Sequence, residues 1–140
     1  MQFKQFIIFG GCGFIGTHMV NLLREKYPNA KVYIADLLAG SSEFSQRVDV
    51  RQEISMSGEF GKDTLIFNFA AVHRTPGHPD YAYFETNIRG AENVCEFARK
   101  HGINNIVFTS SIAPYGAAED QKSEDTLPTP NTPYGISKLV

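Results

Sequence analysis

The sequence contains few of the residues that mark a secreted, metal-binding or membrane protein. Its 140 residues include only two cysteines, Cys12 and Cys95, which are far apart, and four dispersed histidines. A disulfide framework and a metal site are therefore not expected, and a reduced, cytoplasmic compartment fits the cysteine content. No apolar run approaches the roughly 20 residues of a membrane-spanning helix. The N-terminal apolar stretch is interrupted by glycines and lacks the small-residue cleavage site of a signal peptide.

Charge of one sign is not concentrated anywhere in the chain. The formal net charge is −2, and the 13 lysines and arginines are scattered along the sequence. A nucleic-acid partner would require a basic stripe or patch, so neither nucleic acid nor a membrane surface is an expected partner. With 42% hydrophobic residues, the chain can bury one modest core.

A glycine-rich segment directly follows an apolar run near the N-terminus. Residues 5–9 have the apolar character of a strand that is buried on both faces of a parallel sheet. Residues 17–26 continue an amphipathic helical pattern, and strand, glycine turn and helix form the usual context of a dinucleotide-binding loop. We predict that Gly10 permits the tight turn, Gly13 admits a pyrophosphate at the helix N-terminus, and Gly16 allows close helix packing. The alternative is an ordinary glycine-rich connection.

A carboxylate follows the second predicted strand. This strand covers residues 31–35, and Asp36 comes directly after it. At this position a carboxylate accepts hydrogen bonds from the adenosine ribose hydroxyls of NAD. An NADP site would need an arginine for the 2′-phosphate, whereas Leu37 and Leu38 follow here. The sequence therefore predicts NAD as the cofactor, and the alternative is an aspartate that only caps a turn.

Strands and helices alternate along the rest of the chain. We predict strands at 47–50, 65–71 and 105–109, a helix at 81–101, loops at 38–45, 75–80 and 120–133, and a short helical or turn segment at 56–62. Gly102 is expected to end the long helix as its C′ residue. The alternation indicates an α/β fold, a Rossmann-type doubly wound parallel sheet with about five strands. The cofactor should then lie at the carboxyl ends of the first and fourth strands, where the strand order reverses.

A tyrosine and a lysine lie four residues apart in the last predicted helix. Thr132 is its expected N-cap and Pro133 its first residue, so Tyr134 and Lys138 project from one face. A nearby ammonium stabilises a phenolate. Tyr134 could therefore accept a hydroxyl proton while the hydroxyl carbon gives a hydride to a nicotinamide. Ser111, after the fifth strand, could bind the same hydroxyl. By itself this tyrosine–lysine spacing is often just an exposed helix face.

Taken together, these segments resemble the extended short-chain dehydrogenase/reductases, specifically the NAD-dependent sugar-nucleotide epimerase/dehydratase group. The resemblance covers almost the whole chain. It includes the glycine segment 10–16, the N-x-x-G-T-x-N-like segment 87–93, the S-S-x-x-V-Y-G-like segment 110–116, the E-D-x-x-x-x-P lead at 124–130 and Y-x-x-x-K at 134–138. Two positions depart from the usual pattern, Ala91 in place of threonine and Pro114 in place of valine.

The resemblance implies roles for individual residues. Asp49 and Val50 match the pair that holds the adenine ring, residues 69–71 match the strand end that lines the ribose and phosphates, and Ser111 matches the catalytic serine or threonine. The expected catalytic residues are Ser111, Tyr134 and Lys138. The expected cofactor-binding residues are Gly10, Gly13, Phe14, Ile15, Gly16, Asp36, Asp49, Val50, Phe69, Ala70, Ala71, Asn87, Thr109, Tyr134 and Lys138.

The implied function is an NAD-dependent epimerase that acts on a nucleotide sugar by transient hydride transfer, in an enzyme that is a homodimer when complete. Dehydratases of the group carry an Asp-Glu pair where this chain has Ile112 and Ala113, and this difference favours epimerisation. A related dehydratase, decarboxylase or reductase remains an alternative, as does a regulatory or inactive NAD-binding module.

Enzymes of this group are about twice as long as this chain. We therefore expect residues 1–140 to be an NAD-binding Rossmann domain, truncated within the helix that carries Tyr134 and Lys138. The later strands and the substrate domain would then be absent. The 140 residues alone are expected to lack turnover, because nothing in them can enclose a sugar nucleotide.

Overall fold

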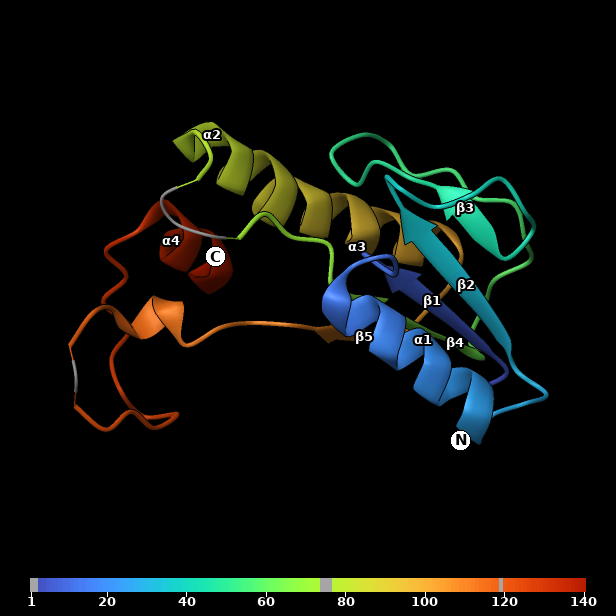
Figure 1. Ribbon diagram of the computed structural model, residues 1–140, viewed down its shortest axis with the longest axis horizontal. Helices are drawn as coiled ribbons and strands as arrows, with labels where there is room; N and C mark the ends of the chain where they lie inside the picture. The colour runs from blue at the N-terminus through green and yellow to red at the C-terminus, as the bar shows by residue number, and fades with distance from the viewer. Residues whose placement is uncertain (1–2, 74–76, 119) are drawn as a thin grey trace.

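The computed structural model describes residues 3–73, 77–118 and 120–140 and shows a single parallel sheet flanked by helices (Figure 1). The strand order is β3-β2-β1-β4-β5, and every neighbouring pair is parallel. The order reverses between β1 and β4, so the predicted doubly wound α/β fold is confirmed. The strands are β1 (Gln5–Phe9), β2 (Lys31–Asp36), β3 (Ser45–Arg47), β4 (Thr64–Asn68) and β5 (Asn105–Phe108).

The first strand lies at the centre of the sheet. Phe9 is opposite Ala35 of β2 on one side and Asn68 of β4 on the other, so these three strands end at the same edge. Ile7, Ile8 and Phe9 are fully buried, which explains why β1 has an apolar run instead of an alternating pattern.

Helices cover both faces of the sheet. Helix α1 (Phe14–Lys26) packs Val20 and Leu23 on one face. The other face is covered by a helical stretch composed of α2 (Asp80–Tyr83), a π-helical turn η1 (Phe84–Arg89) and α3 (Gly90–Lys100). Figure 1 shows this stretch running above the sheet, while α1 lies on the opposite side. Alternate residues of β1 therefore face two separate apolar clusters.

The bounds of two predicted strands differ from the structure by more than one residue. The third strand was expected at 47–50, but β3 ends at Arg47. The residues after it form a turn, because the carboxylate of Asp49 accepts a hydrogen bond from the backbone N–H of Arg51 (3.0 Å). Val48 still donates a backbone hydrogen bond to the Asp36 carbonyl of β2 (3.0 Å), and Val48 and Val50 are both buried, but the regular strand ends before them. The fourth strand, expected to continue to residue 71, ends at Asn68.

The predicted helices are present, although their details differ. Helix α1 begins at Phe14, three residues before the predicted start. The helix expected at 81–101 contains the π-helical turn η1, which sequence periodicity did not indicate. Gly102 has a φ of +66°, as expected of a residue that ends a helix. The segment 56–62 contains bends and a turn and no helix, and the loop predicted at 75–80 lies partly outside the described residues.

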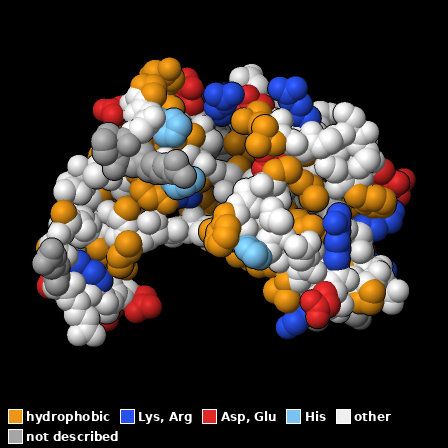
Figure 2. Space-filling view, viewed as in Figure 1, with side chains coloured by type: hydrophobic (Ala, Val, Ile, Leu, Met, Phe, Trp, Pro, Cys, Tyr) orange, Lys and Arg blue, Asp and Glu red, His pale blue; other side chains and the backbone are white. Residues whose placement is uncertain are grey.

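The chain after β5 extends away from the sheet and then returns. A short 3₁₀ turn, η2 (Ala113–Tyr115), precedes a long surface loop, and the last helix is α4 (Pro133–Leu139). The Thr132 side chain accepts a hydrogen bond from the Gly135 N–H (3.0 Å), which confirms the predicted N-cap. Figure 2 shows the molecule bent into an arch, with this last segment as the limb opposite α1. None of the helices in the described ranges is long and apolar enough to cross a membrane.

Replacing Gly16 by alanine should destabilise the fold. A Cβ on Gly16 would clash with the carbonyl oxygen of Gly10 and lie 2.7 Å from the Gly11 Cα, and neither backbone atom can move freely. We expect Gly16→Ala to lower the free energy of unfolding in urea by at least about 1–3 kcal/mol. Gly61→Ala is the control, because a Cβ there meets nothing within 4 Å and should change stability by less than about 0.5 kcal/mol. Equal stability of the two variants would contradict this packing.

Candidate active site

A cleft of about 520 Å³ opens at the carboxyl ends of β1, β2 and β4. The residues that line it come from widely separated parts of the chain, from the glycine turn to α4. All of the predicted site residues except Asn87 and Ser111 line this cleft: Gly10, Gly13, Phe14, Ile15, Gly16, Asp36, Asp49, Val50, Phe69, Ala70, Ala71, Thr109, Tyr134 and Lys138. The fold therefore brings together the predicted cofactor loop and the predicted tyrosine–lysine pair.

The glycine turn leaves room for a ligand in front of α1. Gly10 has a φ of +77°, and a Cβ on it would lie 2.7 Å from the backbone nitrogen of Ala70, so the fold itself requires glycine there. Gly13 is different, because its φ is −73° and its nearest obstacle, the Gly10 carbonyl oxygen, is 3.3 Å from an added Cβ. No side chain caps the first turn of α1. Unpaired N–H groups beside an open, glycine-lined space suit a pyrophosphate.

The carboxylate of Asp36 is held in place by the backbone. Oδ2 accepts a hydrogen bond from the Cys12 N–H (3.0 Å), and Oδ1 accepts one from the Leu38 N–H (3.0 Å). Asp36 thus caps its own turn, as the alternative interpretation expected, and it also lines the cleft, while its contact with a ribose stays a prediction. Each oxygen keeps a further lone pair for a ribose hydroxyl. Burial, and then the nearby Asp36 carboxylate, raise the pKa of the Cys12 thiol, which makes it a poor nucleophile at neutral pH.

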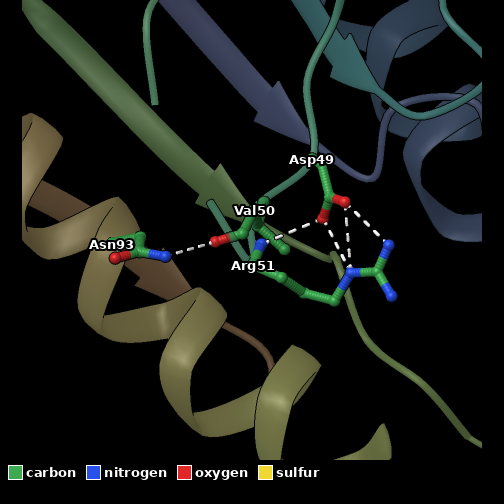
Figure 3. Close-up of polar contacts among 4 residues, drawn as sticks. All are labelled: Asp49, Val50, Arg51 and Asn93. Carbon is green, nitrogen blue, oxygen red and sulfur yellow. Dashed lines mark hydrogen bonds and ion pairs between the residues drawn. The ribbon is translucent and has the colours of Figure 1, made fainter. Parts of the chain in front are cut away.

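Asp49 and Arg51 form an ion pair in the turn after β3, and both residues line the cleft (Figure 3). The Arg51 Nη2 lies 2.7 Å from Asp49 Oδ2, and Nε lies 2.9 Å from Oδ1. The hydrogen bonds from the Arg51 side chain are the main cause that lowers the pKa of the Asp49 carboxyl. Asp49 is therefore an acceptor at neutral pH. Sequence reasoning did not identify Arg51 as a cleft residue, although its position directly after Asp49-Val50 could have indicated it.

Tyr134 and Lys138 enter the cleft from α4. The ring of Tyr134 packs against that of Tyr83, with centroids 6.4 Å apart. Lys138 is buried, its Nζ donates a hydrogen bond to the Thr109 carbonyl (3.0 Å), and Nζ lies 4.8 Å from the Phe108 ring centroid. Burial lowers the pKa of Lys138 below its ordinary value because desolvation disfavours the ammonium.

Two predicted residues do not line the cleft. The side chain of Ser111 accepts a hydrogen bond from the Ala113 N–H (3.2 Å), and Ser110 lines the cleft instead. Asn87 is buried in η1, where its side chain bonds both backbone groups of Val72 and donates to the Ser137 hydroxyl (2.8 Å). The direct contacts proposed for Ser111 and Asn87 stay predictions, while the observed hydrogen bonds of Asn87 join the cleft wall to α4.

The cleft also contains residues that the sequence did not indicate. They are Ala35, Leu37, Val48, Arg51, Val72, His73, Thr86 and Ser110. Most flank predicted residues directly, so strand ends could have suggested them. Thr86 differs from the others because it lies in η1 and not near a strand end, and η1 determines which residues of this helical stretch face the cleft. Within the described ranges, no group of His, Cys, Asp and Glu side chains is arranged to hold a metal ion.

A sequence model of the NAD-dependent epimerase/dehydratase family matches residues 6–140. The chain belongs to this family. The predicted resemblance is thereby confirmed, and NAD, the predicted cofactor, is the one in the family's description. The geometry of the glycine turn fits this cofactor, since Gly13 and the uncapped start of α1 leave space for its pyrophosphate.

Individual relatives are similar to this chain over nearly its whole length. The N-acetyl-alpha-D-glucosaminyl-diphospho-ditrans,octacis-undecaprenol 4-epimerase of Escherichia coli O157:H7 is 32% identical over 133 residues, covering 94% of this chain and 40% of that protein. The crystal structure of a UDP-galactose 4-epimerase has a TM-score of 0.80 at 30% identity, covering 96% of this chain and 48% of that one.

A third relative was solved with the cofactor. The UDP-glucose 4-epimerase of Thermus thermophilus, in complex with NAD, has a TM-score of 0.76 at 28% identity and covers 96% of this chain and 47% of that one. The chain thus spans less than half the length of the relatives it matches here.

The buried lysine should make stability depend on pH in the alkaline range. Between the lowered pKa of Lys138 and its ordinary value of 10.5, the unfolded chain binds more protons than the folded chain. Stability therefore rises with pH in that interval. In urea unfolding between pH 8 and 10.5, we expect the parent chain to gain stability relative to Lys138→Met. Lys26→Met gives the same comparison for an exposed lysine, and a pH-independent difference for Lys138→Met would show that Nζ is hydrated.

Proposed function

We propose that this chain supplies the NAD-binding and proton-transferring part of an enzyme that epimerises C4 of the hexose in a nucleotide sugar. One observation carries the proposal. The open glycine turn at the start of α1 and the Tyr134–Lys138 pair of α4 line a single cleft, although they are more than 100 residues apart in the chain. A cofactor seated on the glycine turn could thus extend toward a phenol that transfers protons.

In the proposed reaction, Tyr134 accepts the proton of the sugar 4-hydroxyl in its phenolate form and later returns it. NAD⁺, when bound, would supply the acceptor and later the donor of the hydride at the same carbon, which is a ketone in between. The ketone turns over between the two steps, so the hydroxyl returns with the opposite configuration. Ser111 is proposed to bind the same hydroxyl, because its O–H can still donate while its oxygen accepts from the Ala113 N–H.

Lys138 is proposed to stabilise the phenolate and to anchor the nicotinamide ribose. An ammonium has three N–H donors, and the Thr109 carbonyl uses one of them. The bond to Thr109 and the Phe108 ring together fix the position of Nζ. Two donors remain for a ribose hydroxyl and for an oxygen of the reacting pair. Removal of this side chain should therefore weaken both cofactor binding and proton transfer.

Dehydration is less well supported than epimerisation. Eliminating water from the sugar requires a further acid and base beside the reacting carbons. Ile112, where the dehydratases have one of these groups, is 68% exposed, and neither it nor Ala113 can transfer a proton. Asp120, a nearby acid, is paired with Lys122 on the surface loop. Glu119, another acid considered at this point, lies outside the described residues.

The group to which the sugar is attached, a nucleotide or a lipid diphosphate, differs between the matched relatives. The matched UDP-galactose 4-epimerase is named for a nucleotide sugar, whereas the Escherichia coli relative is named for a sugar on undecaprenol diphosphate. Both names combine C4 epimerisation with a diphosphate-linked sugar. We commit to the nucleotide sugar because the solved relatives named here are UDP-sugar epimerases. A dehydratase, decarboxylase or reductase of the family, and an NAD-binding module without turnover, are the competing outcomes.

Three further predictions complete this proposal. Residues 1–140 would be the cofactor-binding domain of a longer enzyme, because the matched relatives are about twice as long. The complete enzyme would be a homodimer, as the family resemblance implies. We also propose a cytoplasmic location, which the two free cysteines support, since unpaired thiols persist in a reducing compartment.

Replacing Tyr134 by phenylalanine should abolish most turnover while leaving cofactor binding intact. The ring would still pack against Tyr83, but no oxygen would remain to carry the proton. We expect the turnover of the complete enzyme to fall at least about 10²-fold, with the Kd for NAD unchanged within about threefold, as measured by calorimetric titration. Tyr81→Phe is the matched control, because Tyr81 is 62% exposed on α2 and does not line the cleft. Retained activity in Tyr134→Phe would require another proton carrier.

Incubation of the complete enzyme with NAD⁺ and a panel of UDP-hexoses should give C4 epimers. The panel should include a polyprenyl-diphosphate sugar, and products can be identified by NMR. A 4-keto-6-deoxy product would assign a dehydratase, and a lipid-linked product alone would reassign the carrier. NAD binding without any turnover would favour the regulatory module. Asp120→Asn serves as a check, because this acid should not affect which product forms.

A further inference from the structure

A second pocket, of about 460 Å³, lies at the amino ends of β1 and β2. Gln5 and Lys31, the first residues of these strands, line it together with parts of the loop before β3 and of the segment 58–63 before β4. In Figure 1 these strand ends lie at the end of the sheet away from α4, and the pocket shares no residue with the cleft. Its volume is typical of a small-molecule site. The pocket is therefore separate from the candidate active site.

Hydrogen bonds hold the walls of this pocket in place. The Gln46 Nε2 donates to the backbone carbonyls of Glu43 (2.8 Å) and Ser57 (2.7 Å), and the Gln46 Oε1 accepts from the Ser57 N–H (2.7 Å). Gln46 thereby joins the loop before β3 to the segment before β4. The fully buried Thr64 hydroxyl accepts a hydrogen bond from the Gly61 N–H (3.2 Å). The pocket is thus a feature that the fold itself builds, because side chains of β3 and β4 fix its walls.

A buried polar group in the wall of this pocket lacks a partner. Tyr33 is only 1% exposed, and its ring packs against the rings of Phe44 and Phe60, with centroids 5.2 and 5.1 Å away. No described residue forms a hydrogen bond with its hydroxyl, although a buried hydroxyl without a partner is unfavourable. Tyr33 lines the pocket, and its ring is enclosed by the other aromatic residues. The pocket is therefore the side from which a partner can reach the hydroxyl.

The charge of the pocket favours a cation. Its charged side chains are one lysine and three acids: Lys31, Glu43, Glu59 and Asp63. They carry a formal excess of two negative charges. The Lys4 ammonium lies 4.0 Å from Asp63, whereas no described residue forms an ion pair with Glu43 or Glu59. The aromatic rings of the wall also attract cations. Free carboxylates, a phenol oxygen and aromatic rings together suit an ammonium or guanidinium group.

We propose that this pocket binds a small organic cation, a molecule that bears a guanidinium or an alkylammonium group. The carboxylates of Glu43 and Glu59 accept hydrogen bonds from its N–H groups, and the Tyr33 hydroxyl accepts another. The apolar stem of the ligand lies against the Phe60 ring, which lines the same pocket. The inference does not depend on the proposed function, because no residue of the cleft takes part in it.

Binding is tested on the 140-residue chain with agmatine, which has a guanidinium and an ammonium, and with putrescine, which has two ammonium groups. The Kd of each is measured by NMR titration at constant pH and ionic strength. We expect saturable binding of at least one amine with a Kd of about 1 mM or less, and the largest amide shifts at residues 31–33, 43 and 58–63. Butane-1,4-diol, the neutral analogue of putrescine, should bind at least about tenfold more weakly, because it lacks the charge-assisted hydrogen bonds.

Two variants separate binding from folding. Tyr33→Phe removes only the unpartnered hydroxyl, so it should weaken binding by about threefold or more, while the urea midpoint of the free chain stays the same or rises. Glu59→Gln keeps the shape of the side chain without its charge and should weaken binding at least about threefold. Glu25→Gln is the matched control, because it removes an exposed carboxylate of α1 outside the pocket and should leave the Kd at the parent value.

Several outcomes would overturn the inference. One is the absence of saturable binding of either amine up to about 10 mM, and another is an equal affinity for butane-1,4-diol. If Glu25→Gln weakens binding as much as Glu59→Gln does, the amines are attracted to the acidic surface in general and the pocket is not their site. A lower urea midpoint for Tyr33→Phe would show that its hydroxyl already has a partner in the free chain, which would also contradict the inference.

Discussion

The position of α1 against the end of β1 is the constraint on which the rest of the site depends. Gly16 in the first turn of α1 lies so close to the backbone of Gly10 and Gly11 that no side chain fits between them. This contact sets where α1 starts and aims its unpaired N–H groups across the ends of β1 and β4. The same turn brings the Cys12 N–H to the Asp36 carboxylate. One close backbone approach thus fixes both the open start of α1 and the position of the Asp36 carboxylate, the groups predicted to bind a pyrophosphate and a ribose.

The sequence predicted those features that arise from contacts between residues near one another in the chain. The apolar run of β1, the glycine turn and α1 follow from local sterics and burial, and so do the Thr132 cap and the spacing of Tyr134 and Lys138. Features that depend on distant partners were missed or misplaced. The valines at 48 and 50 suggested a strand, but α3 binds this segment as a turn. Nothing in the helical pattern of 81–101 indicates η1, because its wider turn is tied to buried contacts of Asn87 with Val72 and Ser137.

The helix that carries the candidate catalytic residues is held differently from α1 and α3. Among the described residues, neither of the two apolar clusters of the core includes a residue of α4. Its polar contacts with the rest of the chain include those of Ser137 with Asn87, of the Lys138 ammonium with the Thr109 carbonyl and of the Lys138 carbonyl with the Ser110 hydroxyl. Hydrogen bonds have strict geometry, so they fix the position of this helix more narrowly than apolar packing would. They also make this helix sensitive to the loss of a single partner.

The order of the strands has a consequence for how the chain folds as it is synthesised. The glycine turn, β1 and β2 lie in the first part of the chain, and neighbouring segments can pair early because little loop entropy is lost. The opposite wall of the cleft, from β4 onward, joins them only after the intervening segment has formed. A ligand that spans this junction binds the completed sheet and not its first half, and its binding free energy stabilises only that state. A bound nucleotide would therefore stabilise the association of the early-forming segment, β1 to β2, with the segment from β4 onward.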